Sequence, residues 1–385
     1  MTARLLDVSR LASRAGRTLT GVDRVEMAYL DGLLERSDPL WGLARVRGGL
    51  AILDRGGLLW LRRAVASGGW GLPDLLARLP GGHSGLRARA EADLRRRAIA
   101  WRPFALATPM LRRTLPEGVG YLNVGHANLT DRNLRLVRAA GGRVAVLLHD
   151  AIPLDHPEWQ RVGAAERFRA MLDAVADHAG LAIYNSAHSR ERCEAHMPRA
   201  PEGMVAYLGV DRPAAVGSPQ GRPKGPYFVA LGTIEPRKNH AFLLDLWEGL
   251  RDPRPTLVIA GARGWCNDAV FSRLDSPPAG VVERPNLSDG EVAALLDGSC
   301  GLLFPSLAEG FGLPPAEALA RGVRALCSPL PSLGEFLGPS AVYASLDEPY
   351  SWIRTIMEWA ADPRLIPPAE MPTWKAHLDA VLSRT

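Results

Sequence analysis

The sequence predicts an α/β protein made of two doubly wound, Rossmann-like domains that face each other across a cleft. Short apolar runs typical of buried strands alternate with helix patterns in both halves of the chain. A segment rich in proline and glycine, residues 212–226, separates the two halves and is expected to be the linker. At 385 residues the chain is long enough for two domains with separate cores.

The first domain is expected to span residues 1–211 and to begin with a strand over 5–8. Thr20 and Asp23 then have the spacing of a capping box, which predicts a helix that starts near Gly21. A glycine at a helix start after a first strand admits a phosphate to the backbone, so Gly21 is a candidate phosphate-binding residue. A simple N-cap with a small neighbour explains the same residues.

Charge is distributed unevenly along the chain. Residues 1–200 carry 30 Arg and no Lys against 20 acidic residues (+10), and residues 201–385 carry 16 basic against 21 acidic residues (−5), which together give the overall +5. A basic half suggests an anionic partner, either a membrane surface or a lipid diphosphate. Within the otherwise uninformative stretch 41–118, an Arg-rich helix predicted over 86–100 is a candidate membrane-facing surface, with a solvated helix face as the alternative. Nucleic acid is not expected, because aromatic residues are not interleaved with the arginines and no nucleic-acid motif is present.

The four cysteines are scattered, with no metal or redox spacing, so we expect reduced thiols and no metal site. No run approaches the roughly 18 apolar residues of a membrane span, and the first residues do not resemble a signal peptide. The sequence therefore predicts a cytoplasmic protein, and its basic first half is compatible with a peripheral position on the inner face of the inner membrane.

Polar residues follow two predicted buried strands of the first half, over 121–124 and 144–148, with a helix between them. In open parallel sheets, ligands bind beyond the carboxyl ends of the strands, so these polar residues are candidates for a ligand site. They are His126, Asn128, His149 and Asp150. A structural histidine, satisfied within the fold, is the alternative for each histidine. A further strand over 181–184 leads into a helix with Ser186 as N-cap, and capping is a sufficient role for this serine.

The second domain, expected over 227–350, begins with a strand that is followed by Gly232, Arg237 and Lys238. Glycine permits close approach to the backbone, and a guanidinium fork beside a lysine point charge suits a diphosphate. Basic residues at a helix start are electrostatically unfavourable unless an anion offsets them, so the pattern predicts a diphosphate site. A solvent-exposed basic pair is the alternative.

Residues 301–328 have the pattern of a strand, an exposed loop, a helix and a second strand. The loop contains Glu309, and Glu317 falls in the first helical turn. Three amides precede the helix, those of Phe311, Gly312 and Leu313. Free N–H groups and the helix dipole favour anionic or hydroxyl-rich ligands there. Two carboxylates eight positions apart suit a phosphorylated sugar that also carries a ribose, and the alternative is that Glu317 only complements the dipole while Glu309 is solvated.

Three stretches of the chain resemble one known family. They are EGFGLPPAEALARG (309–322), GTIEPRKNH (232–240) and HDAIPLDHPEW (149–159). These stretches resemble the retaining GT-B glycosyltransferases of the large family that includes sucrose synthase-like and many bacterial polysaccharide enzymes. The resemblance is strongest over 226–345 and weak before 118. It implies a GT-B fold, an acceptor-binding first domain, a nucleotide-sugar-binding second domain, and helices over 351–385 that pack back across the domain junction.

The resemblance also implies residue roles. The catalytic candidates are His149, Glu309, Arg237 and Lys238. The nucleotide sugar would be bound by Gly21, Gly232, Arg237, Lys238, Arg284, Phe311, Gly312, Leu313 and Glu317. The acceptor-side candidates are His126, Asn128 and Asp150.

We therefore expect a retaining, metal-independent glycosyltransferase without a cofactor. It would move a hexose from a nucleotide-diphospho sugar, with GDP-mannose favoured over a UDP- or dTDP-sugar, to a surface-polysaccharide or lipid-linked saccharide. One alternative is a catalytically silent GT-B-like subunit that acts as a binding partner, against which the intact charged residues argue. A sugar-nucleotide epimerase is a second alternative, but it would need a Gly-x-Gly-x-x-Gly fingerprint that residues 5–21 lack.

Overall fold

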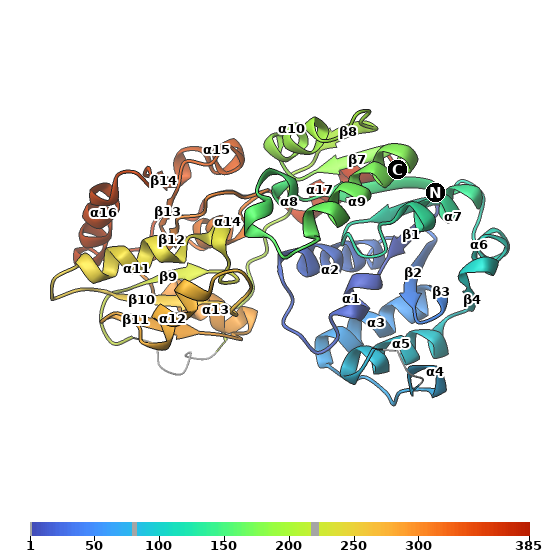
Figure 1. Cartoon of the computed structure of the whole chain (residues 1–385), viewed down its shortest axis with the longest axis horizontal. Coiled ribbons are helices and arrows are strands. Elements are labelled where there is room, and N and C mark those ends of the chain that lie inside the picture. Colours follow the sequence, from blue (N-terminus) through green and yellow to red (C-terminus); the bar gives the residue numbers. More distant parts are fainter. Residues whose placement is uncertain (1, 79–82, 217–222) are drawn as a thin grey trace.

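The computed structural model of the chain describes residues 2–78, 83–216 and 223–385. Its strands form two separate sheets, one in each of two lobes that lie side by side (Figure 1). We call them the first lobe, which contains the sheet of residues 4–205, and the second lobe, which contains the sheet of residues 227–343. Part of the expected linker, residues 217–222, lies outside the described residues.

The first sheet has eight strands in the order β4-β3-β2-β1-β5-β6-β7-β8. Its strands are β1 (Arg4–Asp7), β2 (Leu40–Val46), β3 (Gly49–Leu53), β4 (Ala100–Pro103), β5 (Gly120–Asn123), β6 (Arg143–Leu148), β7 (Leu181–Tyr184) and β8 (Glu202–Val205). β1 pairs in parallel with both β2 and β5, whereas β3 runs antiparallel to β2 and β4. The strand order therefore changes direction between β1 and β5, which is the topological switch point of this sheet.

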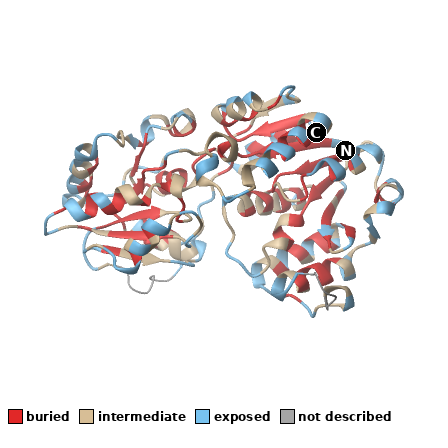
Figure 2. Ribbon diagram, in the orientation of Figure 1, coloured by how far each residue is buried: buried red, intermediate tan, exposed pale blue. Residues whose placement is uncertain are grey.

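Helices cover both faces of the first sheet. They are α1 (Ser9–Ser13), α2 (Gly21–Leu34), α3 (Arg55–Ser67), α4 (Leu75–Arg78), α5 (Gly85–Arg97), α6 (Ala107–Thr114), α7 (Asp131–Ala139), α8 (Ile152–Asp155), α9 (Ala164–His178) and α10 (Ala187–Ala195). Successive strand residues alternate between two apolar clusters: Leu6 and Leu122 belong to one, and their neighbours Leu5 and Tyr121 to the other. This alternation is the pleat of a sheet that is buried on both sides, as the buried strands of Figure 2 show.

Residues 41–118, which the sequence left unassigned, form the β2–β3 hairpin, β4 and the helices around them. The predicted helix over 86–100 is present as α5, but it is not a free surface helix. Ala90 and Leu94 are fully buried in the core of the first lobe. Arg95 bonds Asp74 in two places, at 2.6 and 2.7 Å, with only 6% of its side chain exposed. Part of the basic charge of this helix is therefore neutralised within the lobe.

The second sheet is entirely parallel, in the order β11-β10-β9-β12-β13-β14. Its strands are β9 (Tyr227–Leu231), β10 (Thr256–Ala260), β11 (Val281–Arg284), β12 (Gly301–Phe304), β13 (Ala325–Cys327) and β14 (Val342–Tyr343). Its helices are α11 (His240–Gly249), α12 (Asp268–Asp275), α13 (Asp289–Asp297), α14 (Leu313–Ala320), α15 (Pro331–Leu337) and α16 (Pro349–Ala361). The switch point of this sheet lies between β9 and β12, whose following loops carry the basic pair and Glu309.

The last helix, α17 (Trp374–Leu382), returns to the first lobe and packs on α2. The Tyr29 hydroxyl and His377 Nε2 lie 2.7 Å apart at this contact. Of the segment 351–385, only α17 makes this crossing: α16 belongs to the second lobe, because Trp352 and Trp359 are buried in its core. Both ends of the chain consequently lie in the first lobe (Figure 1).

The described part of the chain contains no helix with the length and apolar character that a membrane crossing needs.

Candidate functional site

The loops that follow β9 and β12 meet at the switch point of the second sheet. After β9, Gly232 has φ +136°. A Cβ at this position would lie 3.3 Å from Lys238 Cε, so glycine allows the lysine stem to pack on the backbone. A short 3-10 helix, Pro236–Lys238, and the left-handed Asn239 (φ +52°) then carry the chain into α11. This tight turn presents Arg237 and Lys238 to the loop after β12.

Glu309 is the acceptor for both cations. Arg237 Nη1 lies 2.6 Å from Glu309 Oε2, and Lys238 Nζ lies 2.6 Å from Glu309 Oε1. Arg237 Nε also contacts Glu235 Oε1 at 2.8 Å. The side chains of Lys238 and Glu309 are 9% and 8% exposed, so water screens these charges weakly. The sequence thus predicted three residues that the structure brings into one ionic cluster.

The electrostatics of the cluster favour a carboxylate that stays ionised. Burial by itself would raise the pKa of Glu309, but Arg237 and Lys238 outweigh it and lower the pKa to about 2. Burial lowers the pKa of Lys238, and Glu309 opposes that shift. A carboxylate of this kind is a weak base, and its two oxygens are fixed in direction by the two cations.

The start of α14 provides backbone donors beside this cluster. Gly312 is the N-cap with φ +102°, a left-handed conformation that a non-glycine residue adopts only with strain. Among the residues that the structure describes, the amides of Phe311, Gly312 and Leu313 have no hydrogen-bond acceptor. The Phe311 ring stacks on Phe336 with ring centroids 4.1 Å apart and is buried, so the side chain is directed away from these amides. Unpaired amides at a helix start form a site for an anion or for hydroxyl oxygens.

Glu317 lies one turn into α14 and faces the first lobe. Arg24 of α2 reaches across, with Nη2 2.6 Å from Glu317 Oε1. Burial raises the pKa of Glu317, and Arg24 opposes the shift. Gly21 stands opposite the same helix start, since a Cβ on it would be 3.9 Å from Leu313 Cδ1. Sequence reasoning did not find Arg24, although its position three residues after Gly21 places both on one face of α2.

A seam of hydrogen bonds joins the two lobes next to Glu309. The Ser186 hydroxyl donates to the Gly310 carbonyl at 2.7 Å, and the Ser189 hydroxyl contacts the Gly310 and His149 carbonyls at 3.0 Å each. Glu335 of α15 accepts from the first two amides of α10, those of Ala187 and His188, at 2.7 Å each. Ser186 is the N-cap of α10, as predicted, and it bonds the other lobe as well.

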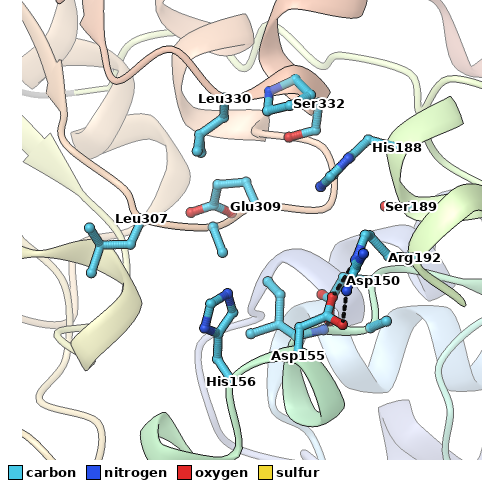
Figure 3. Close-up of a pocket in the computed structure, with 14 residues that line it drawn as sticks. Asp150, Asp155, His156, His188, Ser189, Arg192, Leu307, Glu309, Leu330 and Ser332 are labelled. Atoms are coloured by element: carbon cyan, nitrogen blue, oxygen red, sulfur yellow. Dashed lines mark hydrogen bonds and ion pairs between the residues drawn. The ribbon is translucent and has the colours of Figure 1, made fainter. Parts of the chain in front are cut away.

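A cavity of about 380 Å³ lies between the lobes beside Glu309. Asp150, His156, His188 and Arg192 line it from the first lobe, and Leu307, Glu309, Leu330 and Ser332 line it from the second. In Figure 3, Glu309 lies among side chains from both lobes. Leu307 and Leu330 come from the second lobe, and His156 and Asp150 come from the first. The Ser332 side chain is fully buried, and its hydroxyl has no hydrogen-bond partner among the described residues. The cavity wall therefore carries carboxylate, imidazole and hydroxyl groups, which suit a polyhydroxylated ligand.

The other first-lobe candidates are bonded within their own lobe. His149 Nε2 lies 2.8 Å from the Val124 carbonyl, and its ring lies 4.9 Å from that of His126. His126 Nε2 lies 2.9 Å from the Leu147 carbonyl, and Asn128 donates to Asp7 at 2.9 Å. Burial lowers the pKa of His126 to about 4 and that of His149 well below its ordinary value, so both rings are neutral. Of the four candidates His126, Asn128, His149 and Asp150, it is Asp150 that lines the cavity.

A second cavity, of about 840 Å³, runs along α2 from Arg24 to Arg36. Its other walls are the crossover between the lobes, the start of α13 at Asp289, and α17 with Trp374. Arg284, at the end of β11, is not among the described residues that line either cavity, and its carbonyl accepts from the Gly261 amide at 3.2 Å. Arg24 thus lines the second cavity, on the α2 side of the interface, and Glu309 lines the first, on the α10 side.

Within residues 2–78, 83–216 and 223–385, no group of three or more His, Cys, Asp and Glu side chains is arranged to hold a metal ion. The charged groups that meet at the switch point are Arg237, Lys238 and Glu309, with the amides at the start of α14 beside them.

Comparisons with known proteins give three findings. Residues 217–365 match the family described as "Glycosyl transferases group 1". The serotype-specific mannosyltransferase WbdA of Escherichia coli is 32% identical over 252 residues, which are 58% of this chain and 31% of that protein. The O-antigen chain mannosyltransferase B of Escherichia coli is 32% identical over 123 residues, 31% of this chain and 32% of that protein. The chain thus spans about a third of the length of these relatives.

Among solved structures, HepE from Anabaena in complex with UDP-glucose superposes with a TM-score of 0.64. The alignment covers 100% of this chain and 95% of that chain at 14% identity, so the likeness is one of fold.

Proposed function

We propose that the chain is a retaining mannosyltransferase of the glycosyl transferases group 1 family, which residues 217–365 match. Its two lobes form the GT-B fold. The donor is GDP-mannose, and the acceptor is a saccharide of an O-antigen-like polysaccharide, free or linked to a lipid diphosphate. The mannosyltransferase names of the relatives support the choice of sugar. The charged cluster of Arg237, Lys238 and Glu309 at the switch point carries the proposal.

The donor diphosphate binds Arg237 and Lys238. In the structure both cations pair with one carboxylate, that of Glu309. A diphosphate carries more negative charge than a carboxylate and more acceptor oxygens, so it competes for the same two cations. When the diphosphate binds one or both cations, Glu309 is released from them and accepts hydroxyls of the mannosyl group. The amides of 311–313 donate hydrogen bonds to the nucleotide sugar.

The reaction breaks the bond between the anomeric carbon and the diphosphate oxygen. The acceptor hydroxyl forms its bond to the same face of that carbon, and its proton passes to the departing phosphate oxygen. Negative charge grows on the diphosphate as it leaves, and Arg237, Lys238 and the amides at α14 stabilise it without a metal ion. No cofactor takes part in this scheme.

Glu309 is assigned a positioning task and not that of a covalent nucleophile. In the structure Arg237 and Lys238 hold its two oxygens, and hydroxyls of the mannosyl group take the place of each cation that the diphosphate binds. The carboxylate is thus engaged in orienting the sugar. The His149 ring is neutral and is held by the Val124 carbonyl, and the His149 carbonyl accepts from Ser189 in the seam beside Gly310.

The acceptor enters the cavity of about 380 Å³ beside Glu309. Asp150 and His188 of the first lobe and Ser332 of the second provide polar groups around an incoming sugar. Recruitment to an anionic membrane surface through the basic first half stays a prediction.

Two measurements test the proposal. Thermal unfolding in the presence of GDP-mannose, UDP-glucose and dTDP-rhamnose should show the largest stabilisation with GDP-mannose. Incubation with radiolabelled GDP-mannose should release mannose slowly without acceptor and faster with mannosyl acceptors. A protein that no nucleotide sugar stabilises, and that releases no sugar from any of them, would instead be the silent subunit.

Gly21→Ala should weaken donor binding and leave the fold intact. The added methyl group meets Leu313 at an ordinary contact distance of 3.9 Å, so the protein itself tolerates it. The same methyl group projects between the starts of α2 and α14, where the diphosphate lies. We expect the donor KM to rise about tenfold, equivalent to about 1.4 kcal/mol, with an unchanged Tm. Gly249→Ala, which meets no atom within 4 Å, is the control, and equal KM values for the two variants would remove Gly21 from the donor site.

A further inference from the structure

The ion pair between Arg24 and Glu317 is a contact between the lobes. The family resemblance assigns Glu317 to the binding of the nucleotide sugar, and within the proposed function we take it as the acceptor for the ribose hydroxyls. Arg24 lies on α2 in the first lobe, and Glu317 lies on α14 in the second. The 2.6 Å contact uses Oε1 of Glu317. The two side chains are 20% and 10% exposed, so the pair is largely withdrawn from water.

Glu317 is surrounded by more negative than positive charge. Asp289 at the start of α13 and Asp211 in the crossover both face it, and both raise its pKa further above the value that burial imposes. Arg24 is the cation that opposes them. The same two aspartates and Glu317 act on Arg24 and raise the pKa of its guanidinium against the effect of burial. The guanidinium is therefore charged at any pH of interest, and the charge state of Glu317 depends on it.

A ribose binds a carboxylate through two neighbouring hydroxyls that donate to its oxygens. The ionised form accepts with either oxygen, whereas a protonated carboxyl turns one oxygen into a donor and keeps a weaker, neutral acceptor. Hydrogen bonds to an ionised acceptor are about twice as strong as those to a neutral one. The ribose site of this chain thus needs a positive charge next to Glu317, and the first lobe supplies it.

We propose that Arg24 is a positioning residue for the nucleotide ribose: its guanidinium, 2.6 Å from Oε1 of Glu317, keeps the carboxylate charged at the interface between the lobes, where it accepts the ribose hydroxyls. The inference rests on the proposed function, because it takes Glu317 as the ribose ligand. It adds that the ribose site is built by both lobes, so it is complete only when α2 and α14 face each other.

The test is the affinity of two probes, GDP and inorganic pyrophosphate, measured by calorimetry between pH 5.5 and 8.5. Pyrophosphate carries the diphosphate charge without a ribose. For Arg24→Ala we expect GDP to bind about tenfold more weakly at pH 7, with affinity that recovers as the pH rises, while pyrophosphate binding stays unchanged. Without Arg24 the pKa of Glu317 rises further, so this carboxyl is protonated at low pH and ionises as the pH increases. The GDP affinity of the variant should therefore increase with pH.

Companion variants separate a charge effect from damage to the fold. Arg24→Lys should restore most of the GDP affinity, because it returns the charge. Glu317→Gln should bind GDP weakly at every pH, and the double variant Arg24→Ala/Glu317→Gln should bind no more weakly than Glu317→Gln alone. Arg135→Ala removes an exposed arginine of α7 that pairs with Asp131 and lines neither cavity, and it should match the wild type.

The outcomes are distinct. Equal losses of GDP and pyrophosphate affinity in Arg24→Ala would show that Arg24 contacts the phosphates and overturn the inference. A GDP affinity that equals the wild type, or that is lowered to the same extent at every pH, would also overturn it. A wild-type protein that binds pyrophosphate but gains nothing from the nucleoside of GDP would overturn the proposed function as well.

Discussion

Arg237→Ala/Lys238→Ala should lower kcat/KM for the donor by at least about 10³-fold. Removal of a single donor to a developing oxyanion lowers the rate by about 10² to 10³ in enzymes that depend on such stabilisation, and this variant removes two charges. The loss should appear in kcat as well as in KM, because the leaving diphosphate is more negative in the transition state than in the bound donor. Steady-state kinetics with GDP-mannose measures both.

The same double variant leaves Glu309 and Glu235 without their cations, so its stability must be separated from its activity. A charge that loses its buried partner costs about 3 to 5 kcal/mol. Adding Glu309→Gln removes one of the two orphaned charges, and we expect this triple variant to regain stability in urea unfolding but not activity. Arg273→Ala, which removes an exposed arginine that pairs with Asp245 and Glu248 on the outside of the second lobe, is the matched control. A double variant with more than a tenth of wild-type activity would refute the assignment of the diphosphate site.

Gly310→Ala should nearly abolish activity by forcing the lobes apart. A Cβ at position 310 would lie 2.0 Å from the His149 carbonyl oxygen and 3.0 Å from Asp150 Cβ, and neither backbone can withdraw without breaking the seam of Ser186 and Ser189. Overpacking of this kind costs about 1 to 3 kcal/mol. We expect at least a hundredfold loss of kcat, because Glu309 precedes this residue and moves with it.

Gly334→Ala provides the control for that substitution. Gly334 lies in α15 near the same seam, and a methyl group on it meets no atom within 4 Å. It should keep wild-type activity and stability. Small-angle scattering should show a larger radius of gyration for Gly310→Ala than for Gly334→Ala, and equal scattering with equal activity would show that the lobes do not depend on this contact.

The sequence predicted the second lobe well because its signals are local. Neighbouring residues in the chain set the strand over 227–231 and the helix start at Leu313. Arg237, Lys238 and Glu309 lie in the loops that follow such strands, so the sequence indicated where these three residues would be found. The strand order then brings the two loops together at the switch point, as the rule for parallel sheets requires.

What the sequence did not show depends on contacts between distant segments. The β2–β3 hairpin turns at Arg47 and Gly48, and its strands are buried on both sides, so they lack the alternation that marks an exposed hairpin. Arg24 is one of many arginines in the first half of the sequence, and its contact with Glu317 of α14 is what marks it as part of the site. The orientation of His149 is set by the carbonyl of Val124, which follows the neighbouring strand β5, and the residues around His149 in the sequence do not indicate that partner.

The path of the chain between the lobes has a mechanical consequence. Two separate stretches cross from lobe to lobe, one after β8 and one before α17, and they are joined side by side where the Val210 amide donates to the Pro372 carbonyl at 3.0 Å. Two links at one place resist a twist of one lobe against the other better than a single link would. The paired crossing therefore helps to keep α2 in register with α14, where Arg24 meets Glu317.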